Sequence, residues 1–132
     1  AYSGLNADGR ILATKAGSKL NLLGLTMMTT LRLIHFKFLA ETKQKYTQKG
    51  GVRPFGISAL IAGIDPQNRP RLFYTDPSGS FSEWKAHTCG RNSKQVSEYL
   101  EKHYKANMTT EEGMKLVIKA LLDVVESGNK NI

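Results

Sequence analysis

The chain has 132 residues, of which 40% are hydrophobic, and this length and composition fit a globular domain with a buried core. No apolar run reaches about 18 residues, so the sequence predicts no transmembrane helix. The first residues lack the basic-then-apolar pattern of a signal peptide. The single cysteine, Cys89, excludes an internal disulfide and fits a reducing compartment.

The net charge of +8 is concentrated in one stretch of the chain. Residues 10–54 contain nine Lys or Arg and one acid, Glu41, whereas the remainder contains ten charges of each sign. A basic segment of this kind indicates either an anionic partner such as nucleic acid or an exposed helix face. Because no aromatic stacking positions are interleaved with the cations, no nucleic-acid partner is expected.

The first element that the residues define is the end of a helix at residues 46–51. Gly50 and Gly51 release the backbone into conformations that other residues avoid. Pro54 lacks a backbone N–H, so regular hydrogen bonding resumes only after it. Residues 55–64 are almost wholly apolar and predict a strand that is covered on both faces.

Two further strands are predicted, at residues 71–75 and at residues 80–88. Turns with proline at the second position, at residues 65–68 and 76–79, separate the three strands. Because the connections are short, the strands form an antiparallel meander.

Two helices are predicted in the last third of the chain. Ser93 is expected to cap the first helix, and Thr109 with Glu112 has the spacing of a capping box before the second. The second helix has an apolar stripe and is expected to end at Gly128. The stripe consists of Met114, Val117, Ile118, Leu121, Leu122 and Val125. Residues 129–132 look like the approach to another strand.

The sequence offers little for catalysis. His35, His87 and His103 have no metal-ligand spacing with Cys89 or with a pair of carboxylates, so neither a metal nor a cofactor is expected. Cys89 is interpreted as a small buried residue rather than a reactive thiol. Residues 90–94 are interpreted as a helix cap rather than a phosphate loop.

Several motifs, in order and correctly spaced, strongly resemble the α-type subunits of the 20S proteasome. They are YTQKGGVRPFG, LIAGID, PRLFYTDPSGSFSEWKA, GRNSK, EYLEKHY and KLVIKALLDVVESGNKNI. The chain looks most like the α subunit at the fourth position of the eukaryotic ring. The resemblance implies an α+β fold, the four-layer α/β/β/α sandwich of the N-terminal nucleophile hydrolase type. Residues 1–132 are expected to form a single partial domain, a fragment of that fold.

One segment departs from the family. Residues 5–12 match the start of the family's first long helix, and residues 40–46 match the end of the second. Between them, residues 13–38 are anomalous, because the acids and the proline of the family are absent and the apolar residues fit helical and strand periodicity poorly. A frame error in a predicted gene and a divergent insertion are both open. An intact reading frame, found by peptide mass spectrometry across residues 15–37, would exclude the frame error.

The resemblance implies a non-catalytic structural and gating subunit of the α ring, which takes part in ubiquitin-dependent protein degradation. The implied partners are other α subunits in a heptameric ring, β-type subunits and regulatory particles, with no membrane partner. The implied location is the cytoplasm and nucleus. One alternative is a threonine-nucleophile peptidase of the same fold, which needs an N-terminal threonine where this chain has Ala1. The other is a basic nucleic-acid-binding protein.

Two candidate surfaces follow from the resemblance. Gly4 and Leu5 match a glycine-leucine pair that helps to line a pocket for the C-terminal tails of regulatory ATPases, although a glycine that opens a helix is an equal alternative. The second surface is a ring-contact loop that supports the gate, formed by Tyr46, Thr47, Gln48, Gly50, Gly51, Arg53, Pro54 and Phe55. Arg53 is expected either to pair across the subunit boundary or to pack locally.

The isolated chain is expected to be aggregated or loosely packed. The helix at residues 114–125 is expected to cover only one face of the meander, and missing strands would leave edges unpaired. A sharp, cooperative melt of a monomeric sample would contradict this expectation.

Overall fold

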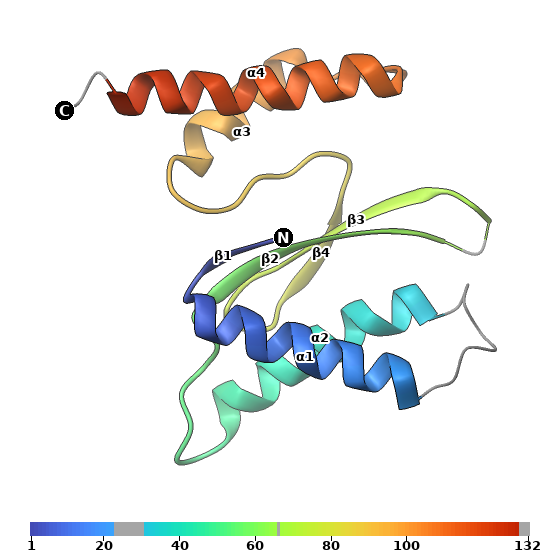
Figure 1. The fold of residues 1–132 in the computed structure, drawn as a ribbon, viewed down its shortest axis with the longest axis vertical. Helices are drawn as coiled ribbons and strands as arrows, with labels where there is room; N and C mark the ends of the chain where they lie inside the picture. The colour runs from blue at the N-terminus through green and yellow to red at the C-terminus, as the bar shows by residue number, and fades with distance from the viewer. Residues whose placement is uncertain (23–30, 66, 130–132) are drawn as a thin grey trace. The chain divides into compact units, whose positions relative to one another are not determined.

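A computed structural model describes residues 1–22, 31–65 and 67–129. The chain divides into two compact units, Ala1–Lys85 and Ala86–Ile132, which we describe separately (Figure 1). Helices and an antiparallel sheet confirm the predicted α+β class. That residues 1–132 form a single partial domain stays a prediction.

The first unit contains a four-stranded antiparallel sheet in the order β1-β2-β3-β4. The strands are β1 (Tyr2–Gly4), β2 (Ile57–Ile64), β3 (Pro70–Thr75) and β4 (Phe81–Trp84). Strands β2 to β4 are the predicted meander, and a hydrogen bond between described residues closes each of its two connections. Asn68 N–H donates to the Asp65 carbonyl at 2.9 Å, and Gly79 N–H donates to the Asp76 carbonyl at 3.1 Å.

Strand β4 is shorter than the predicted strand at residues 80–88. Trp84 is its last residue and pairs with Leu72 of β3. The next positions of β3 in the same register are Arg71 and Pro70, and proline has no N–H to donate to a partner strand. The prediction of a strand to residue 88 was therefore wrong, because alternation alone does not show where the partner strand stops.

The strand register places three buried residues on one face of the sheet. Ala59 pairs with Thr75, and Ile61 pairs with Phe73, so these residues and Ile57 share a face. Helices α1 (Asn6–Leu22) and α2 (Leu31–Gln48) lie on one side of the sheet (Figure 1). Ile57, Phe73 and Thr75 are buried.

The opposite face carries Leu60, Ala62 and Ile64 of β2. Ala62 is exposed and Ile64 is 42% exposed. The strands in the described part of the chain belong to a single sheet, so the second sheet of the expected sandwich is not among them. Coverage of both faces stays a prediction for a longer chain.

The two helices extend into the anomalous segment, residues 13–38. Helix α1 continues to Leu22 and α2 begins at Leu31, so most of that segment is helical. That the segment is anomalous stays a prediction, because its poor apolar periodicity falls mainly on residues 23–28. The predictions for residues 23–30 lie outside the described residues.

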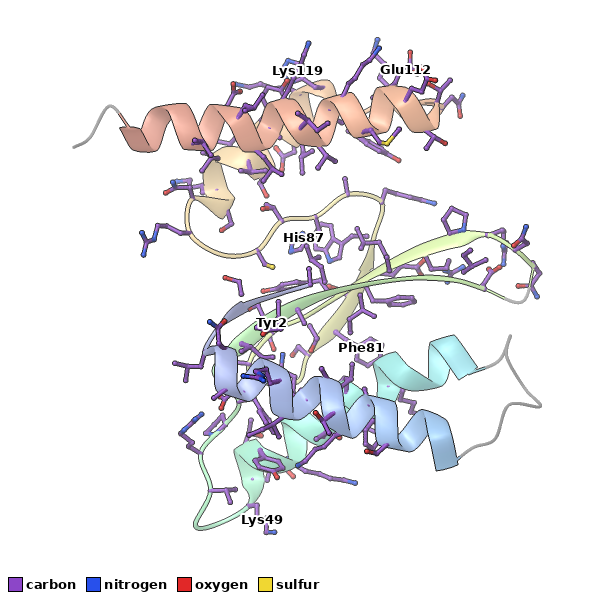
Figure 2. All side chains as sticks on the ribbon, in the orientation of Figure 1. Tyr2, Lys49, Phe81, His87, Glu112 and Lys119 are labelled. Carbon is purple, nitrogen blue, oxygen red and sulfur yellow. The ribbon has the colours of Figure 1, made fainter. Side chains whose placement is uncertain are left out.

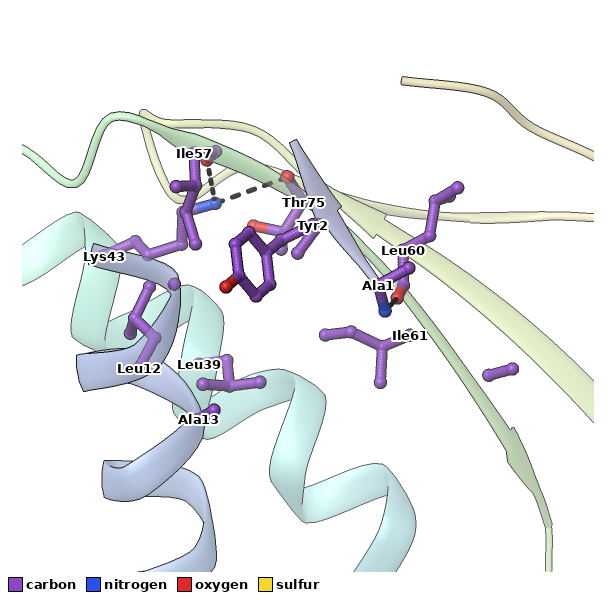
Figure 3. Close-up of a pocket in the computed structure, with 13 residues that line it drawn as sticks. Ala1, Tyr2, Leu12, Ala13, Leu39, Lys43, Ile57, Leu60, Ile61 and Thr75 are labelled. Carbon is purple, nitrogen blue, oxygen red and sulfur yellow. Dashed lines mark hydrogen bonds between the residues drawn. The ribbon is translucent and has the colours of Figure 1, made fainter. Parts of the chain in front are cut away.

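Helix α2 is fixed to the sheet by a buried lysine. Lys43 is only 1% exposed. Its Nζ donates to the carbonyl of Ile57 at 2.8 Å and to the carbonyl of Thr75 at 3.3 Å (Figure 3). These carbonyls belong to adjacent strands, so one ammonium joins α2 to both β2 and β3.

The second unit contains helices α3 (Ser93–His103) and α4 (Thr110–Asn129). The predicted Ser93 cap is wrong, because the cap residue is Asn92, at φ 62°, and its side chain makes no capping hydrogen bond. Ser93 instead donates its N–H to the Gly90 carbonyl at 3.2 Å, in the turn that leads into the helix.

The predicted capping box at the start of α4 is confirmed. Thr109 N–H donates to Glu112 Oε2 at 2.8 Å, and Glu112 N–H donates to Thr109 Oγ1 at 3.3 Å. The hydrogen bonds that Glu112 Oε2 accepts from the Thr109 N–H and from the Thr109 hydroxyl lower the pKa of the Glu112 carboxyl. The six residues of the apolar stripe on α4 are 51–58% exposed. The strand expected near residues 129–132 lies, apart from Asn129, outside the described residues.

Candidate functional site

The first candidate surface lies where β1 ends and α1 begins. Gly4 has φ 128°, and a Cβ atom there would collide with the carbonyl oxygen of Gly56. Leu5 N–H donates to that same carbonyl at 3.0 Å, and the Leu5 side chain is exposed. The glycine is therefore required by close approach of two backbones, in addition to opening the helix.

The buried carboxylate of Asp8 joins α1 to the segment that follows α2. Asp8 is 4% exposed, and its Oδ2 accepts the N–H of Gly56 at 2.8 Å. Arg53 donates to both carboxylate oxygens, with Nη1 to Oδ2 at 2.7 Å and Nη2 to Oδ1 at 2.8 Å. This bidentate geometry is the strongest form of a carboxylate–guanidinium pair.

The environment of Asp8 strongly favours its charged form. The hydrogen bonds from Arg53 and then from the Gly56 N–H lower the pKa of the Asp8 carboxyl to about 2. The same pairing raises the pKa of the Arg53 guanidinium above its ordinary value. The pair is thus ionised throughout the physiological pH range, although the Arg53 side chain remains 63% exposed.

The second candidate surface follows α2 and turns back toward the sheet. Tyr46, Thr47 and Gln48 form the last turn of α2, and Gly51 takes φ 78° in the exposed turn after it. Lys49, at the start of that turn, extends away from the sheet (Figure 2). Pro54 is exposed, as is Gly50.

Two aromatic rings attach this loop to the core. The rings of Tyr46 and Phe55 lie 4.5 Å apart between centroids, and Phe55 packs in a buried cluster with Leu12 and Ile57. Lys15 Nζ donates to Tyr46 Oη at 2.7 Å, which lowers the pKa of the Tyr46 hydroxyl. The loop is consequently held at both of its ends, by Tyr46 and by Phe55.

The two candidate surfaces meet at Gly56. Of the predicted residues, Gly4 and Leu5 contact Gly56 directly, and Arg53 reaches the same place through Asp8. Arg53 therefore pairs within its own chain, which is the local packing left open in the sequence analysis. That these residues act in docking and gating stays a prediction.

The sequence analysis missed Asp8, which is the residue that joins the two surfaces. It lies 45 residues from Arg53 and 48 residues from Gly56 along the chain. One signal was available, because Asp8 is the only acid among residues 1–40 of the chain. An isolated acid of that kind must find cations or backbone N–H groups when it is buried.

A hollow of about 280 Å³ lies beside the Asp8–Arg53 pair. It is lined by Asp8, Ile11, Tyr46, Val52, Arg53 and Phe55. Its walls thus combine the first turns of α1 with the last turn of α2 and the loop after it.

A second cavity, of about 270 Å³, lies in the first unit near the buried lysine (Figure 3). It is largely apolar and is lined in part by Tyr2, Leu12, Leu39 and Ile61. The Lys43 ammonium at its wall donates to strand carbonyls, so the charge there serves the packing of α2.

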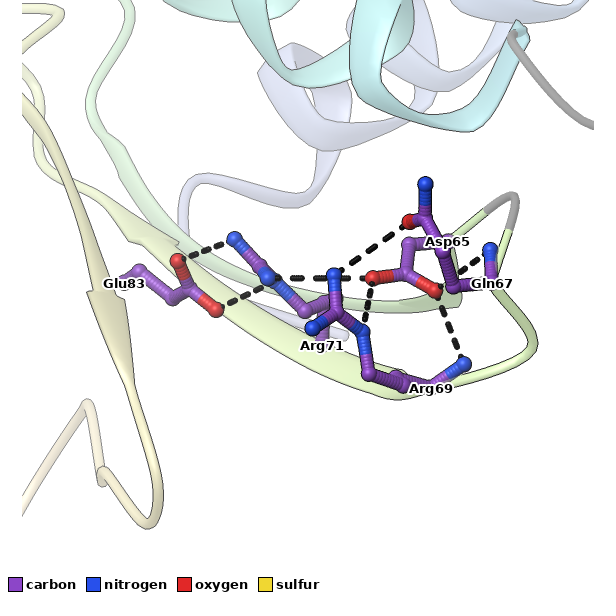
Figure 4. Close-up of polar contacts among 5 residues, drawn as sticks. All are labelled: Asp65, Gln67, Arg69, Arg71 and Glu83. Atoms are coloured by element: carbon purple, nitrogen blue, oxygen red, sulfur yellow. Dashed lines mark hydrogen bonds and ion pairs between the residues drawn. The ribbon is translucent and has the colours of Figure 1, made fainter.

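A second arginine–carboxylate cluster occupies the hairpin between β2 and β3 (Figure 4). Asp65 is 3% exposed; its Oδ1 accepts the N–H of Arg69 at 2.8 Å, and its Oδ2 accepts Arg69 Nε at 2.9 Å. Burial raises the pKa of the Asp65 carboxyl, but these bonds outweigh burial and the net pKa is lowered. Arg71 joins the cluster to Glu83 of β4, with Nη2 to Oε2 at 2.7 Å.

The part of the chain that the structure describes contains no group of three or more His, Cys, Asp or Glu residues placed to hold a metal ion. Among the same residues, none of the helices is both long enough and apolar enough to cross a membrane.

The architecture and the motifs define the class of this protein. The profile of the proteasome subunit family matches residues 1–132, and the chain belongs to that family. The resemblance seen in the sequence is thereby confirmed.

Similar curated proteins carry α-type names. The chain is 51% identical over 132 residues to proteasome subunit alpha type-7 of Dictyostelium discoideum, a match that covers 99% of this chain and 52% of that protein. It is 51% identical over 134 residues to alpha type-7-B of Arabidopsis thaliana, covering 100% and 53%. It is 48% identical over 137 residues to alpha type-4 of Saccharomyces cerevisiae, covering 100% and 54%. The chain spans about half the length of the curated relatives it matches.

Proposed function

We propose that this chain belongs to a non-catalytic subunit of the proteasome α ring, with a structural and gating role in protein degradation. The observation that carries the proposal is the similarity of the entire chain to relatives named as α-type subunits. The contacts of Gly4, Leu5 and Arg53 are consistent with it, since they bring together at Gly56 the two surfaces that the resemblance assigns to docking and to the gate.

The proposed partners are the other α subunits of a heptameric ring, β-type subunits and regulatory particles. The docking surface would be Gly4 and Leu5, with the hollow beside Arg53 available to side chains of an incoming tail. The location that goes with this role is the cytoplasm and nucleus, and the proposed ring position is the fourth.

The nucleic-acid alternative is weakened by where the basic residues lie. Within residues 10–54, Lys15 contacts Tyr46, Lys43 is buried against strand carbonyls, and Arg53 pairs with Asp8. Lys43 is buried and Lys15 and Arg53 already have partners within the first unit, so these three cations are less available for phosphate contacts. Contacts within the first unit therefore account for part of the basic charge of residues 10–54.

The test is to purify the tagged full-length gene product from cells and from a host that lacks its partners. From cells, we expect co-purification of α-type and β-type subunits in one particle, identified by mass spectrometry. From the host, we expect no hydrolysis of fluorogenic peptides. Hydrolysis that a threonine-directed inhibitor abolishes, with no β-type subunit in the sample, would instead establish the peptidase alternative.

A further inference from the structure

Strand β4 forms one edge of the four-stranded sheet. In the order β1-β2-β3-β4 it pairs with β3 on one side, and all 4 of its residues are exposed. Within residues 1–22, 31–65 and 67–129, which the structure describes, no strand pairs with its other side. The edge of a sheet presents backbone N–H and C=O groups to which another extended chain can bind.

The turn between β3 and β4 sets the phase of the hydrogen bonding between these strands. Bonding in an antiparallel pair alternates, so every second residue turns its N–H and C=O toward the partner strand. Asp76 N–H donates to the Ser80 carbonyl at 3.2 Å, and these two residues continue the register in which Thr75 pairs with Phe81. Asp76 and Ser80 are thus opposite each other in a hydrogen-bonded position, and the next pair, Thr75 with Phe81, is in the alternate position.

The same alternation runs along β4 and divides its residues into two sets. Ser82 and Trp84, which pair with β3 at the following hydrogen-bonded positions, turn their backbone groups toward β3. Phe81 and Glu83 therefore turn theirs away from β3, toward the outer edge of the sheet. Each of these two residues offers one N–H donor and one C=O acceptor to a strand placed there.

The side chains of β4 leave this edge open to pairing. Natural edge strands are often protected by lysine or proline, and β4 has neither. Its one charged residue is Glu83, whose Oε2 accepts Arg71 Nη2 of β3 at 2.7 Å, so the carboxylate is engaged with the neighbouring strand of its own sheet (Figure 4). Phe81 is 55% exposed and Trp84 is 44% exposed, and their spacing places them on opposite faces of the sheet. Backbone groups directed outward, with an exposed aromatic side chain on each face, are what strand addition uses.

We propose that the outer edge of β4 pairs with an extended segment of a neighbouring subunit in the assembled particle, which adds a strand to the sheet. The proposal rests on the proposed function, since that function places other subunits beside this chain. The partner is a polypeptide, because only a peptide backbone supplies the alternating donors and acceptors that match Phe81 and Glu83. Its segment should carry an apolar side chain beside Phe81, since cross-strand aromatic and aliphatic pairs stabilise a sheet.

The experiment compares the full-length gene product in purified core particles with the same product alone. Amide hydrogen exchange is measured residue by residue along β4, by mass spectrometry with electron-transfer fragmentation. The N–H groups of Ser82 and Trp84 face β3 and should exchange slowly in both samples, which makes them an internal reference. We expect exchange at Phe81 and Glu83 to be about tenfold or more slower in the particle than in the product alone.

A pair of variants tests the backbone donor itself. Glu83→Pro removes an N–H that points outward and leaves the N–H groups that face β3 in place. Glu83→Gln is the matched control, because it also loses the carboxylate that Arg71 contacts but keeps the N–H. Co-expressed with the wild type, Glu83→Pro should enter particles about fivefold less often, as expected for one lost hydrogen bond, whereas Glu83→Gln should enter as often as the wild type. If Glu83→Pro fails to fold, the exchange pattern of the wild type decides the question.

The outcomes separate the strand addition from the proposed function. If the product is absent from the particle, the proposed function fails and the strand addition fails with it. If the product is present but Phe81 and Glu83 exchange as fast as in the product alone, the function stands and the strand addition is overturned. Slow exchange at both residues in the product alone would also overturn it, because the edge would then be covered by another segment of the same chain in a monomeric sample, or by a second copy in a dimeric one.

Discussion

Gly79 is the position where a single added methyl group should damage the first unit most predictably. It ends the turn that begins at Asp76, it is buried, and its φ is 89°. A Cβ atom would lie 2.6 Å from the backbone nitrogen of Gln44 and 2.7 Å from the carbonyl oxygen of Ala40, both in α2. The turn therefore packs directly against the helix backbone, and neither partner atom can rotate away.

Two costs set the magnitude for Gly79→Ala. A left-handed backbone costs an alanine about 1–2 kcal/mol relative to glycine. The contacts also fall about 0.8 Å short of ordinary van der Waals distance, so α2 must move away from the turn. Overpacking of this kind costs about 1–3 kcal/mol. We therefore expect the free energy of unfolding to fall by about 2–5 kcal/mol, a large part of the roughly 5–15 kcal/mol typical of a domain.

The assay is equilibrium urea unfolding of the full-length gene product, followed by far-ultraviolet circular dichroism and extrapolated linearly to water. Gly17→Ala is the matched control, because Gly17 lies in α1 with no atom within 4 Å of an added Cβ. It should stabilise the protein by about 0.5–1 kcal/mol. If Gly79→Ala changes the unfolding free energy by no more than the control does, the tight turn-to-helix contact is refuted.

Three further predictions test other contacts. Lys43→Met should lower the free energy of unfolding by about 1–3 kcal/mol in the same urea assay, because buried carbonyls of Ile57 and Thr75 lose a donor. Thr109→Ala should reduce α4 stability by about 1 kcal/mol, seen as faster amide exchange in its first turn. The pKa of Asp8 is about 2 in the folded chain against an ordinary 3.8, so its contribution is complete above about pH 4 and is lost as pH falls from 4 toward 2. The urea midpoint of the wild type should therefore fall more steeply over that window than that of Asp8→Asn, and parallel curves would contradict the assignment.

The strands and turns of the first unit were predictable because local chemistry determines them. Pro54 sets where regular pairing can resume, and the turns at residues 65–68 and 76–79 use proline and aspartate in positions that favour them. Strand β2 follows from an apolar run, and its partners follow from the short connections. The end of β4 was not predictable from its own residues, because Pro70 of the partner strand decides it.

The sequence predicted some residues of the candidate site but not how they are arranged. The resemblance named Gly4, Leu5 and Arg53, but no local pattern shows that all three meet at Gly56. That meeting depends on Asp8, which is 45 residues from its partner Arg53. Hydrogen bonds across such a separation arise from the packing of α1 against the loop, and a single sequence carries no periodic signal for them.

The motifs that identify this family share a physical property with the candidate site. At Gly4 and Gly79, the backbone of one segment touches the backbone of another, so an added side chain has no place to go. Asp8 is constrained in a similar way, because its two oxygens must satisfy three donors in fixed positions. The exposed stripe on α4 imposes no such restriction, since an apolar face tolerates many residues of suitable size. Backbone contacts thus impose residue identity, whereas an amphipathic face imposes only a pattern that unrelated helical proteins also have. The close backbone contacts at Gly4 and Gly79 therefore restrict how the sheet packs against its own neighbouring segments more tightly than the α4 stripe restricts its partners.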